Sequence, residues 1–187
     1  METEQILDKI YPLPLASKQR LLNIIAENQF AKGTILPQAE KREKNIYFIK
    51  KGIVRAFAFA DGNELTFWFG KEGETVLSMR SYVDDKKSYE SVELLENGSL
   101  YALKTELLKE LFLEDIHIAN WGRKLAEKEL VQTEERLISR QFKTATQRYK
   151  ELLEQEPQLL QRVQLSYIAS YLGITQVSLS RIRAEIK

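Results

Sequence analysis

The chain has 187 residues, of which 43% are hydrophobic, and a formal net charge of +1, so it can form one large domain or two small ones. It contains no cysteine, which excludes disulfide bonds, iron–sulfur clusters and thiolate zinc sites and is typical of the reducing cytoplasm. No segment approaches the roughly 18–20 consecutive apolar residues of a membrane span, and the N-terminus has no signal-like pattern. We therefore expect a cytoplasmic protein without a membrane span.

Residues 2–29 have the periodicity of helices. Ile6, Leu7 and Ile10 would share one helical face, and residues 21–25 would form a second apolar face. Two prolines lie between these faces, which predicts two helices rather than one, because proline interrupts a helix.

The pattern changes to strands between Phe30 and Leu103. Residues 46–59 are rich in β-branched and aromatic side chains, which favour strands. Asp61-Gly62 and Asn97-Gly98 are typical hairpin turns. The further expected strands cover residues 63–70, 73–79, 88–95 and 99–103. Many short antiparallel strands separated by glycine turns predict a jelly roll or barrel.

Helical periodicity returns after residue 104. A short helix is expected over residues 105–115, and one long helix from Ile116 to about Phe142, because no proline interrupts it. Small and apolar residues recur along the long helix in the pattern of an imperfect coiled-coil seam. These residues are Ala119, Ala126, Leu130, Thr133 and Leu137. We predict that this helix pairs with a second copy of the chain; packing on its own domain is the alternative.

The last segment predicts two short helices joined by a tight turn. Residues 145–156 form an amphipathic helix that Pro157 is expected to end. After it, Ile168 and Leu172 are four residues apart and would share one helical face. Gly173 can adopt the left-handed conformation that a turn needs, and Thr175 can cap the helix that follows. This is the arrangement of a helix-turn-helix; an ordinary helical hairpin is the alternative.

The exposed face of the final helix carries hydrogen-bond donors and cations, which suit base edges and phosphates. These residues are Gln176, Ser178, Ser180, Arg181 and Arg183. Residues 137–187 contain eight basic and four acidic residues, whereas the rest of the chain contains 20 basic and 23 acidic residues. A basic C-terminal segment on a slightly acidic body supports a nucleic-acid-binding module.

This order of elements resembles the catabolite-activator and fumarate–nitrate-regulator superfamily of bacterial transcription factors (Crp/Fnr). The motifs that carry the resemblance are IYFIKKGIVRAF, RYKELLEQEP, and IASYLGI with LSRIR, the last pair being similar to Bacteroidetes members. The resemblance covers nearly the whole chain and implies an α+β fold. Its parts would be a double-stranded β-helix or jelly-roll sensor domain over residues 1–115, a dimerisation helix over 116–142 and a winged-helix-like helix-turn-helix domain over 143–187.

In the cyclic-nucleotide-binding members of that superfamily, a Gly-Glu pair holds the ribose and an Arg-Ser pair neutralises the phosphate. An ungapped alignment places these pairs on Leu77-Ser78 and Ser88-Tyr89, so both charged residues are missing here. Because a phosphate needs a fixed cation or a row of N–H donors, we expect that the barrel does not bind cAMP well. Its effector is therefore not identified. The candidate pocket residues are Phe57, Phe67, Trp68, Ser78, Arg80, Ser88 and Tyr89, although an aromatic stripe in a barrel can also be plain core.

The same alignment places the base-reading positions of the superfamily on Gln176, Val177 and Arg181. Arg181 could pair with guanine through two hydrogen bonds. Val177 departs from the family, because valine can contact only a thymine methyl where a glutamate would accept a hydrogen bond from cytosine. The candidate phosphate contacts are Thr175, Ser178, Ser180 and Arg183, of which Arg183 can equally be a solvated residue.

The sequence has no phosphate-binding glycine loop, metal-ligand cluster or nucleophile–base motif, and its single histidine, His117, is expected on the surface or at an interface. We predict a non-enzymatic, homodimeric regulator that binds a palindromic operator in double-stranded DNA. The sequence identifies no metal site and no cofactor. The resemblance allows RNA polymerase as a further partner. Two alternatives are a small-molecule-binding barrel whose C-terminal helices only oligomerise it, and a constitutive DNA binder whose barrel binds nothing.

Overall fold

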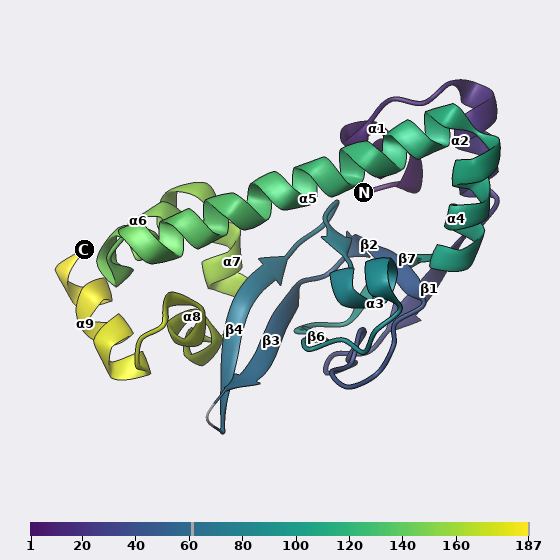
Figure 1. Cartoon of the computed structure of the whole chain (residues 1–187). Coiled ribbons are helices and arrows are strands. Elements are labelled where there is room, and N and C mark those ends of the chain that lie inside the picture. Colours follow the sequence, from purple (N-terminus) through teal and green to yellow (C-terminus); the bar gives the residue numbers. More distant parts are fainter. Residues whose placement is uncertain (61, 187) are drawn as a thin grey trace. The chain divides into compact units, whose positions relative to one another are not determined.

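The structure is a computed structural model that describes residues 1–60 and 62–186 (Figure 1). Its helices are α1 (Thr3–Ile10), α2 (Leu15–Leu22), α3 (Met79–Asp84), α4 (Thr105–Glu114), α5 (Ile116–Phe142), α6 (Ala145–Gln155), α7 (Pro157–Arg162), α8 (Leu165–Leu172) and α9 (Gln176–Glu185). Its strands are β1 (Ile25–Phe30), β2 (Asn45–Lys51), β3 (Val54–Ala60), β4 (Asn63–Gly70), β5 (Thr75–Val76), β6 (Ser91–Leu94) and β7 (Gly98–Lys104).

The chain divides into two compact units. Unit 1 contains Met1–Ala56 and Phe69–Leu130, and unit 2 contains the described residues of Phe57–Trp68 and Val131–Lys187. Strands β3 and β4 and helix α5 each run from one unit into the other along the chain. The distal half of the β3–β4 hairpin therefore belongs with the C-terminal helices.

Two antiparallel sheets form the barrel. One has the strand order β1-β7-β2-β5 and the other the order β4-β3-β6. The segment before β2 extends the second sheet, because the amide of Leu36 donates to the carbonyl of Val92 (2.7 Å) and the amide of Val92 donates to Pro37 (2.9 Å). The predicted jelly roll is thus confirmed.

The core of unit 1 joins one face of the first sheet to the helices. Trp121 of α5 is fully buried, its ring meets Phe48 of β2 edge-on with centroids 6.1 Å apart, and its indole N–H donates to the carbonyl of Leu7 (3.1 Å). The core also holds Ile6, Ile10, Leu21, Ile46, Tyr101, Leu103, Leu108, Ile118 and Leu125. Burial of this apolar surface holds α1, α2 and the first half of α5 on the barrel.

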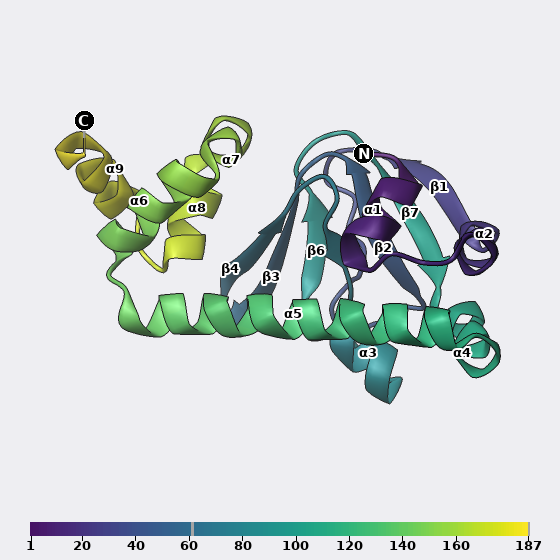
Figure 2. The ribbon, with the colours of Figure 1, turned by 90° about the horizontal axis from the view of Figure 1, so that it is seen from above.

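Helices α4 and α5 meet at a sharp bend (Figure 2). Asp115 lies at the bend and caps α5, because its Oδ1 accepts from the amides of His117 (3.0 Å) and Ile118 (3.3 Å). Helix α5 is continuous through Gly122, where a Cβ atom would lie 2.3 Å from the ring of Phe112. The glycine is therefore needed for the close approach of α4. His117 itself is exposed.

The expectation of helix through residue 29 is wrong. Helix α2 ends at Leu22, and Ile25–Phe30 forms β1, which pairs with β7 along its whole length from Ile25↔Leu103 to Phe30↔Gly98. A helix here would leave the N–H and C=O groups on one edge of β7 without β-sheet partners. Pairing with a strand about seventy residues later in the chain, rather than local periodicity, decides this element.

Two further predictions in the barrel and beyond it need correction. The expected strand at 73–79 is reduced to Thr75–Val76, and the segment after it forms α3. Ser81 anchors that helix, since its hydroxyl accepts from the amide of Glu43 (3.2 Å) and donates to the carbonyl of Lys86 (2.9 Å). Pro157 ends α6 but also starts α7, because a proline at the first helical position loses no hydrogen bond.

The predicted turn at Asp61-Gly62 falls between β3 and β4 in the chain. Asp61 lies outside the described residues, as does Lys187, and Gly62 has a φ of +78°.

Candidate nucleic-acid interface and sensor barrel

The turn between α8 and α9 is built from local hydrogen bonds. Gly173 has a φ of +68°, its amide donates to the carbonyl of Ser170 (3.0 Å), and the amide of Ile174 donates to Ala169 (3.0 Å). This pair of bonds is a Schellman motif, which ends α8. Thr175 then caps α9 by accepting from the amide of Ser178 (3.1 Å). The two helices therefore keep the arrangement that the sequence predicts.

Helix α9 buries one side and exposes the other. Leu179 is 1% exposed, and Ile168 and Leu172 of the preceding helix α8 are also buried. Gln176, Val177, Arg181 and Arg183 are exposed, with Val177 at 63%. An exposed valine at the start of a capped helix has no packing role, which leaves it free to contact a partner.

The three hydroxyls near this face already take part in hydrogen bonds. Ser180 donates to the carbonyl of Gln176 (3.0 Å), and the hydroxyls of Thr175 and Ser178 lie 3.0 Å apart. A phosphate oxygen can only accept a hydrogen bond, so Ser180 would have to release its bond to Gln176 to donate to a phosphate.

Arg148 of α6 ties the end of α5 to the end of α8. Its Nη1 donates to the carbonyls of Lys143 (2.6 Å) and Arg140 (3.2 Å), and its Nη2 donates to the carbonyl of Leu172 (2.5 Å). The last carbonyls of a helix lack partners within the helix and carry its negative dipole end, so a guanidinium suits both positions. The buried Nε of Arg148 has no hydrogen-bond partner within the described residues.

Tyr171 lies among the basic side chains of this region. Burial and the charge of Glu151 raise the pKa of the Tyr171 hydroxyl, whereas the charges of Arg136, Arg148 and Arg140 lower it, and the net change is upward. Its surroundings place three cations close to the first helix of the helix-turn-helix.

In the barrel, the positions aligned with the charged residues of cyclic-nucleotide-binding proteins hold two buried serines. Ser78 is 1% and Ser88 0% exposed; Ser78 donates to Ser88 (3.0 Å), and Ser88 donates to the carbonyl of Glu90 (3.0 Å). Glu90 is itself 6% exposed, and its Oε2 has no hydrogen-bond partner within the described residues. The two serine positions therefore supply no cation to a phosphate.

The other candidate pocket residues differ in burial. Tyr89 is 56% exposed and its ring lies 5.9 Å from the exposed guanidinium of Arg80. Phe57 is 5% exposed, and Phe67 and Trp68 are half-buried. Burial raises the pKa of Tyr89, as does the charge of Glu90, whereas Arg80 lowers it.

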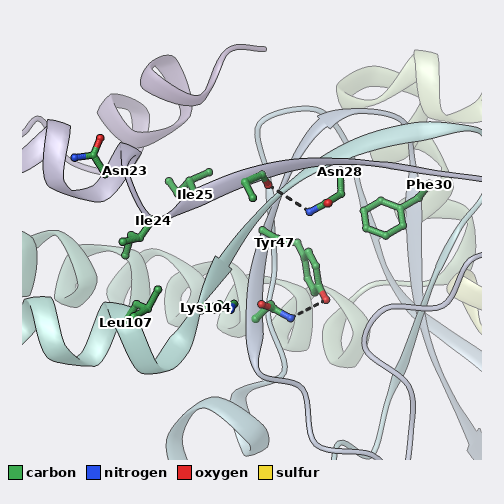
Figure 3. Close-up of a pocket in the computed structure, with 11 residues that line it drawn as sticks. Asn23, Ile24, Ile25, Asn28, Phe30, Tyr47, Lys104 and Leu107 are labelled. Atoms are coloured by element: carbon green, nitrogen blue, oxygen red, sulfur yellow. Dashed lines mark hydrogen bonds between the residues drawn. The ribbon is translucent and has the colours of Figure 1, made fainter.

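A groove of about 420 Å³ lies elsewhere, on the first sheet beside β1 (Figure 3). Ala26 and Ala102 face each other across the strand pair and leave room between the larger side chains. Tyr47 lines the groove, and its hydroxyl contacts Asn45 (3.2 Å) and Glu43 (3.2 Å). Burial, with the charge of Glu43 beside it, raises the pKa of Tyr47 well above its ordinary value. No pattern in the sequence indicates this groove.

The second half of α5 exposes a row of apolar residues. They are Leu130 (70%), Val131 (52%), Leu137 (62%), Ile138 (48%) and Phe142 (77%). Of the predicted seam, Ala126 and Thr133 are also exposed, and Ala119 is half-buried. Val131 and Ile138 follow Leu130 and Leu137 by one residue, so they widen the predicted seam into a broader apolar face.

Metal and membrane sites are not seen in the part of the chain that the structure describes. Within residues 1–60 and 62–186, His, Cys, Asp and Glu side chains do not gather in threes as a metal site requires. No helix of the same residues combines the length and apolar character needed to cross a membrane.

Comparisons with known proteins agree with the architecture. Residues 27–115 match the family model described as the cyclic nucleotide-binding domain. FixK2 from Bradyrhizobium japonicum is similar in structure, with a TM-score of 0.75 and 20% identity over 87% of this chain and 84% of its own. A protein of Eubacterium rectale assigned to the Crp/Fnr family of transcriptional regulators has a TM-score of 0.74 and 18% identity, over 95% and 87% of the two chains. For the catabolite activator protein of Thermus thermophilus the TM-score is 0.60 and the identity 20%, over 97% and 86%.

No curated protein sequence matches the chain. At identities of 20% or less, the solved structures establish the fold, and the family model establishes the barrel. Residues 27–115 therefore resemble the cyclic nucleotide-binding domain, and the chain as a whole has the fold seen in solved structures of Crp/Fnr transcription regulators.

Proposed function

We propose that the protein is a homodimeric transcription regulator that binds a palindromic operator in double-stranded DNA. The observation that carries the proposal is the exposed face of α9, where Arg181, Gln176 and Val177 project from a helix that Leu179 anchors and Thr175 caps. Arginine pairs with guanine and glutamine with adenine in the major groove. Regulators of the Crp/Fnr family share this fold, which supports the same use of the helix-turn-helix here.

The exposed apolar residues of α5 support a dimer. A second copy would cover Leu130, Val131, Leu137 and Ile138, which are about half exposed or more in one chain. Two recognition helices related by two-fold symmetry read half-sites about one helical turn apart, roughly 34–36 Å. In this proposal residues 1–115 sense or transmit a signal, 116–142 pair the subunits and 143–187 bind DNA.

We further propose that cAMP is not the effector. The hydrogen-bonded serines at positions 78 and 88 supply no cation to a phosphate. The barrel would then bind a different effector, or no effector at all. It is proposed to act without enzymatic chemistry and in the cytoplasm, and RNA polymerase is a further proposed partner.

Selection of bound DNA from a random pool by the purified protein, at a stated salt concentration, tests the proposal. We expect a palindromic motif with half-sites one turn apart, guanine at the position read by Arg181 and thymine at the position next to Val177. No enrichment, with the pool alone and with cell extract added as an effector source, would contradict it.

A second candidate function is that of a small-molecule-binding barrel whose C-terminal helices only oligomerise it. The groove beside β1 supports this alternative. The variant Arg181→Ala separates the two, because it weakens operator binding under the first function and has no DNA binding to change under the second. It leaves oligomerisation unchanged under both.

A further inference from the structure

One side chain joins the β3–β4 hairpin to the helix-turn-helix. Ser170 of α8 accepts a hydrogen bond from the amide of Thr66 (2.9 Å) and donates one to the carbonyl of Glu64 (3.0 Å). Both partners are backbone groups of β4, and α8 lies beside this strand in both ribbon views (Figures 1 and 2). Ser170 and Thr66 are 104 positions apart in the chain.

The contact joins one side chain to two backbone groups of the edge strand β4. Strand β4 is at the edge of its three-stranded sheet, so the groups of Glu64 and Thr66, two residues apart, point to the same outer side. A hydroxyl can donate and accept at once, which lets one serine bind both groups. Thr66 is 0% exposed, so this part of the strand is also shielded from water.

We infer that Ser170 is a positioning residue that clamps helix α8, and through it the reading helix α9, to the distal half of the β3–β4 hairpin. We call its two bonds to β4 the hairpin clamp. Because β3 and β4 continue into the barrel, the clamp gives the barrel a connection to α8 that does not pass through α5. Helix α9 follows α8 through the Schellman turn at Gly173, so holding α8 also holds α9.

The clamp favours DNA binding rather than blocking it. With the clamp closed, Gln176, Val177 and Arg181 remain exposed, so the hairpin does not cover the reading face. A helix held in place before binding loses less conformational freedom when it binds, and this preorganisation raises affinity. The inference rests on the proposed DNA-binding function for this part of its argument.

The test uses three variants of the full-length protein. Ser170→Ala removes the clamp, Ser170→Thr keeps a hydroxyl, and Ser166→Ala is the matched control, an exposed serine one turn earlier on α8. Two quantities are measured: the hydrogen-exchange rate of the Thr66 amide by NMR, and the affinity for the selected operator. In Ser170→Ala we expect Thr66 exchange to rise and operator affinity to fall, each by about tenfold for the loss of two hydrogen bonds. Ser166→Ala should match the wild type, and Ser170→Thr should retain most of both properties.

Each outcome decides a separate point. Unchanged Thr66 exchange in Ser170→Ala overturns the clamp, and faster exchange with unchanged or higher operator affinity overturns its positioning role. If the wild type selects no DNA, the proposed function fails. The connection between β4 and α8 is then judged from hydrogen-exchange rates alone. Faster exchange of both β4 and α8 amides in Ser170→Ala supports the connection. Faster exchange confined to the Thr66 amide overturns it.

Discussion

Ser78 donates a 3.0 Å hydrogen bond to Ser88 inside the barrel, and Ser88 donates a second hydrogen bond of 3.0 Å to the carbonyl of Glu90. The two hydroxyls therefore use their donor protons on each other and on the backbone. A phosphate entering this site would meet two engaged hydroxyls, and it would have to break their hydrogen bonds without gaining a cation.

The first prediction follows from this relationship. Titration of the purified protein with cAMP, followed by calorimetry, should show no saturable binding in the micromolar range. The prediction rests on the residues Ser78 and Ser88, because the fold by itself does not exclude cAMP. A dissociation constant in the low micromolar range would contradict it.

Arg181→Ala should weaken binding to the selected operator by roughly 5- to 150-fold, the range that one lost bidentate contact to guanine represents. The loss should be confined to sequences with guanine at that position. Arg183→Ala is the comparison: loss of a phosphate contact should weaken binding to all sequences alike and lower its salt dependence, whereas loss of a solvated residue should change neither. Fluorescence anisotropy with matched and mismatched duplexes measures both effects, and an equal loss on every duplex would refute the base-reading role.

Leu137→Asp should weaken dimerisation by about tenfold or more, because it places a charge at the centre of the apolar face of α5. Leu113→Asp on α4 is the control, since Leu113 is 90% exposed and lies outside that face. Analytical ultracentrifugation over a range of concentrations gives the dissociation constants. If Leu137→Asp and Leu113→Asp dimerise equally, the apolar face is not the subunit contact.

Arg148→Met should lower the free energy of unfolding of the C-terminal helices by about 2–4 kcal/mol, because it removes charged hydrogen bonds to three helix-end carbonyls. Arg148→Lys keeps the charge but cannot reach both helix ends with one ammonium group, so an intermediate loss is expected. Urea unfolding followed by circular dichroism measures the change. Equal stability of Arg148→Met and wild type would show that these bonds have no net effect.

Asp115 predicts a dependence of stability on pH. Burial by itself raises the pKa of Asp115. Hydrogen bonds from Ser17, Ile118 and His117 and the charge of Arg20 lower the pKa by more than burial raises it, so it lies below its ordinary value near 3.8. The charged form therefore stabilises the fold above that ordinary value, and the contribution disappears as the pH falls through the folded-state pKa.

Asp115→Asn tests this dependence because the amide oxygen can still cap α5 while the charge is gone. The variant should be less stable than the wild type at pH 7, and the difference should vanish at strongly acidic pH. Glu110→Gln on the exposed face of α4 serves as the control. Thermal unfolding at a series of pH values gives the comparison, and a difference independent of pH would contradict the prediction.

Local patterns in the sequence were sufficient for the elements whose contacts are local. The turn at Gly173, the cap at Thr175 and the helix from Ile116 to Phe142 depend on residues within a few positions of one another, and all three occur as predicted. Backbone conformation and capping act over one helical turn, so the order of residues alone determines them.

Only the tertiary structure decided the features whose partners are distant. Strand β1 was predicted as helix because apolar spacing over residues 21–25 fits both, and pairing with β7 settles it. Arg148 reaches Leu172 over 24 positions and Ser170 reaches Thr66 over 104, so neither role leaves a local pattern. Hydrogen bonds of this kind depend on which backbone groups packing leaves at an edge or helix end, and that is known only once the chain has folded.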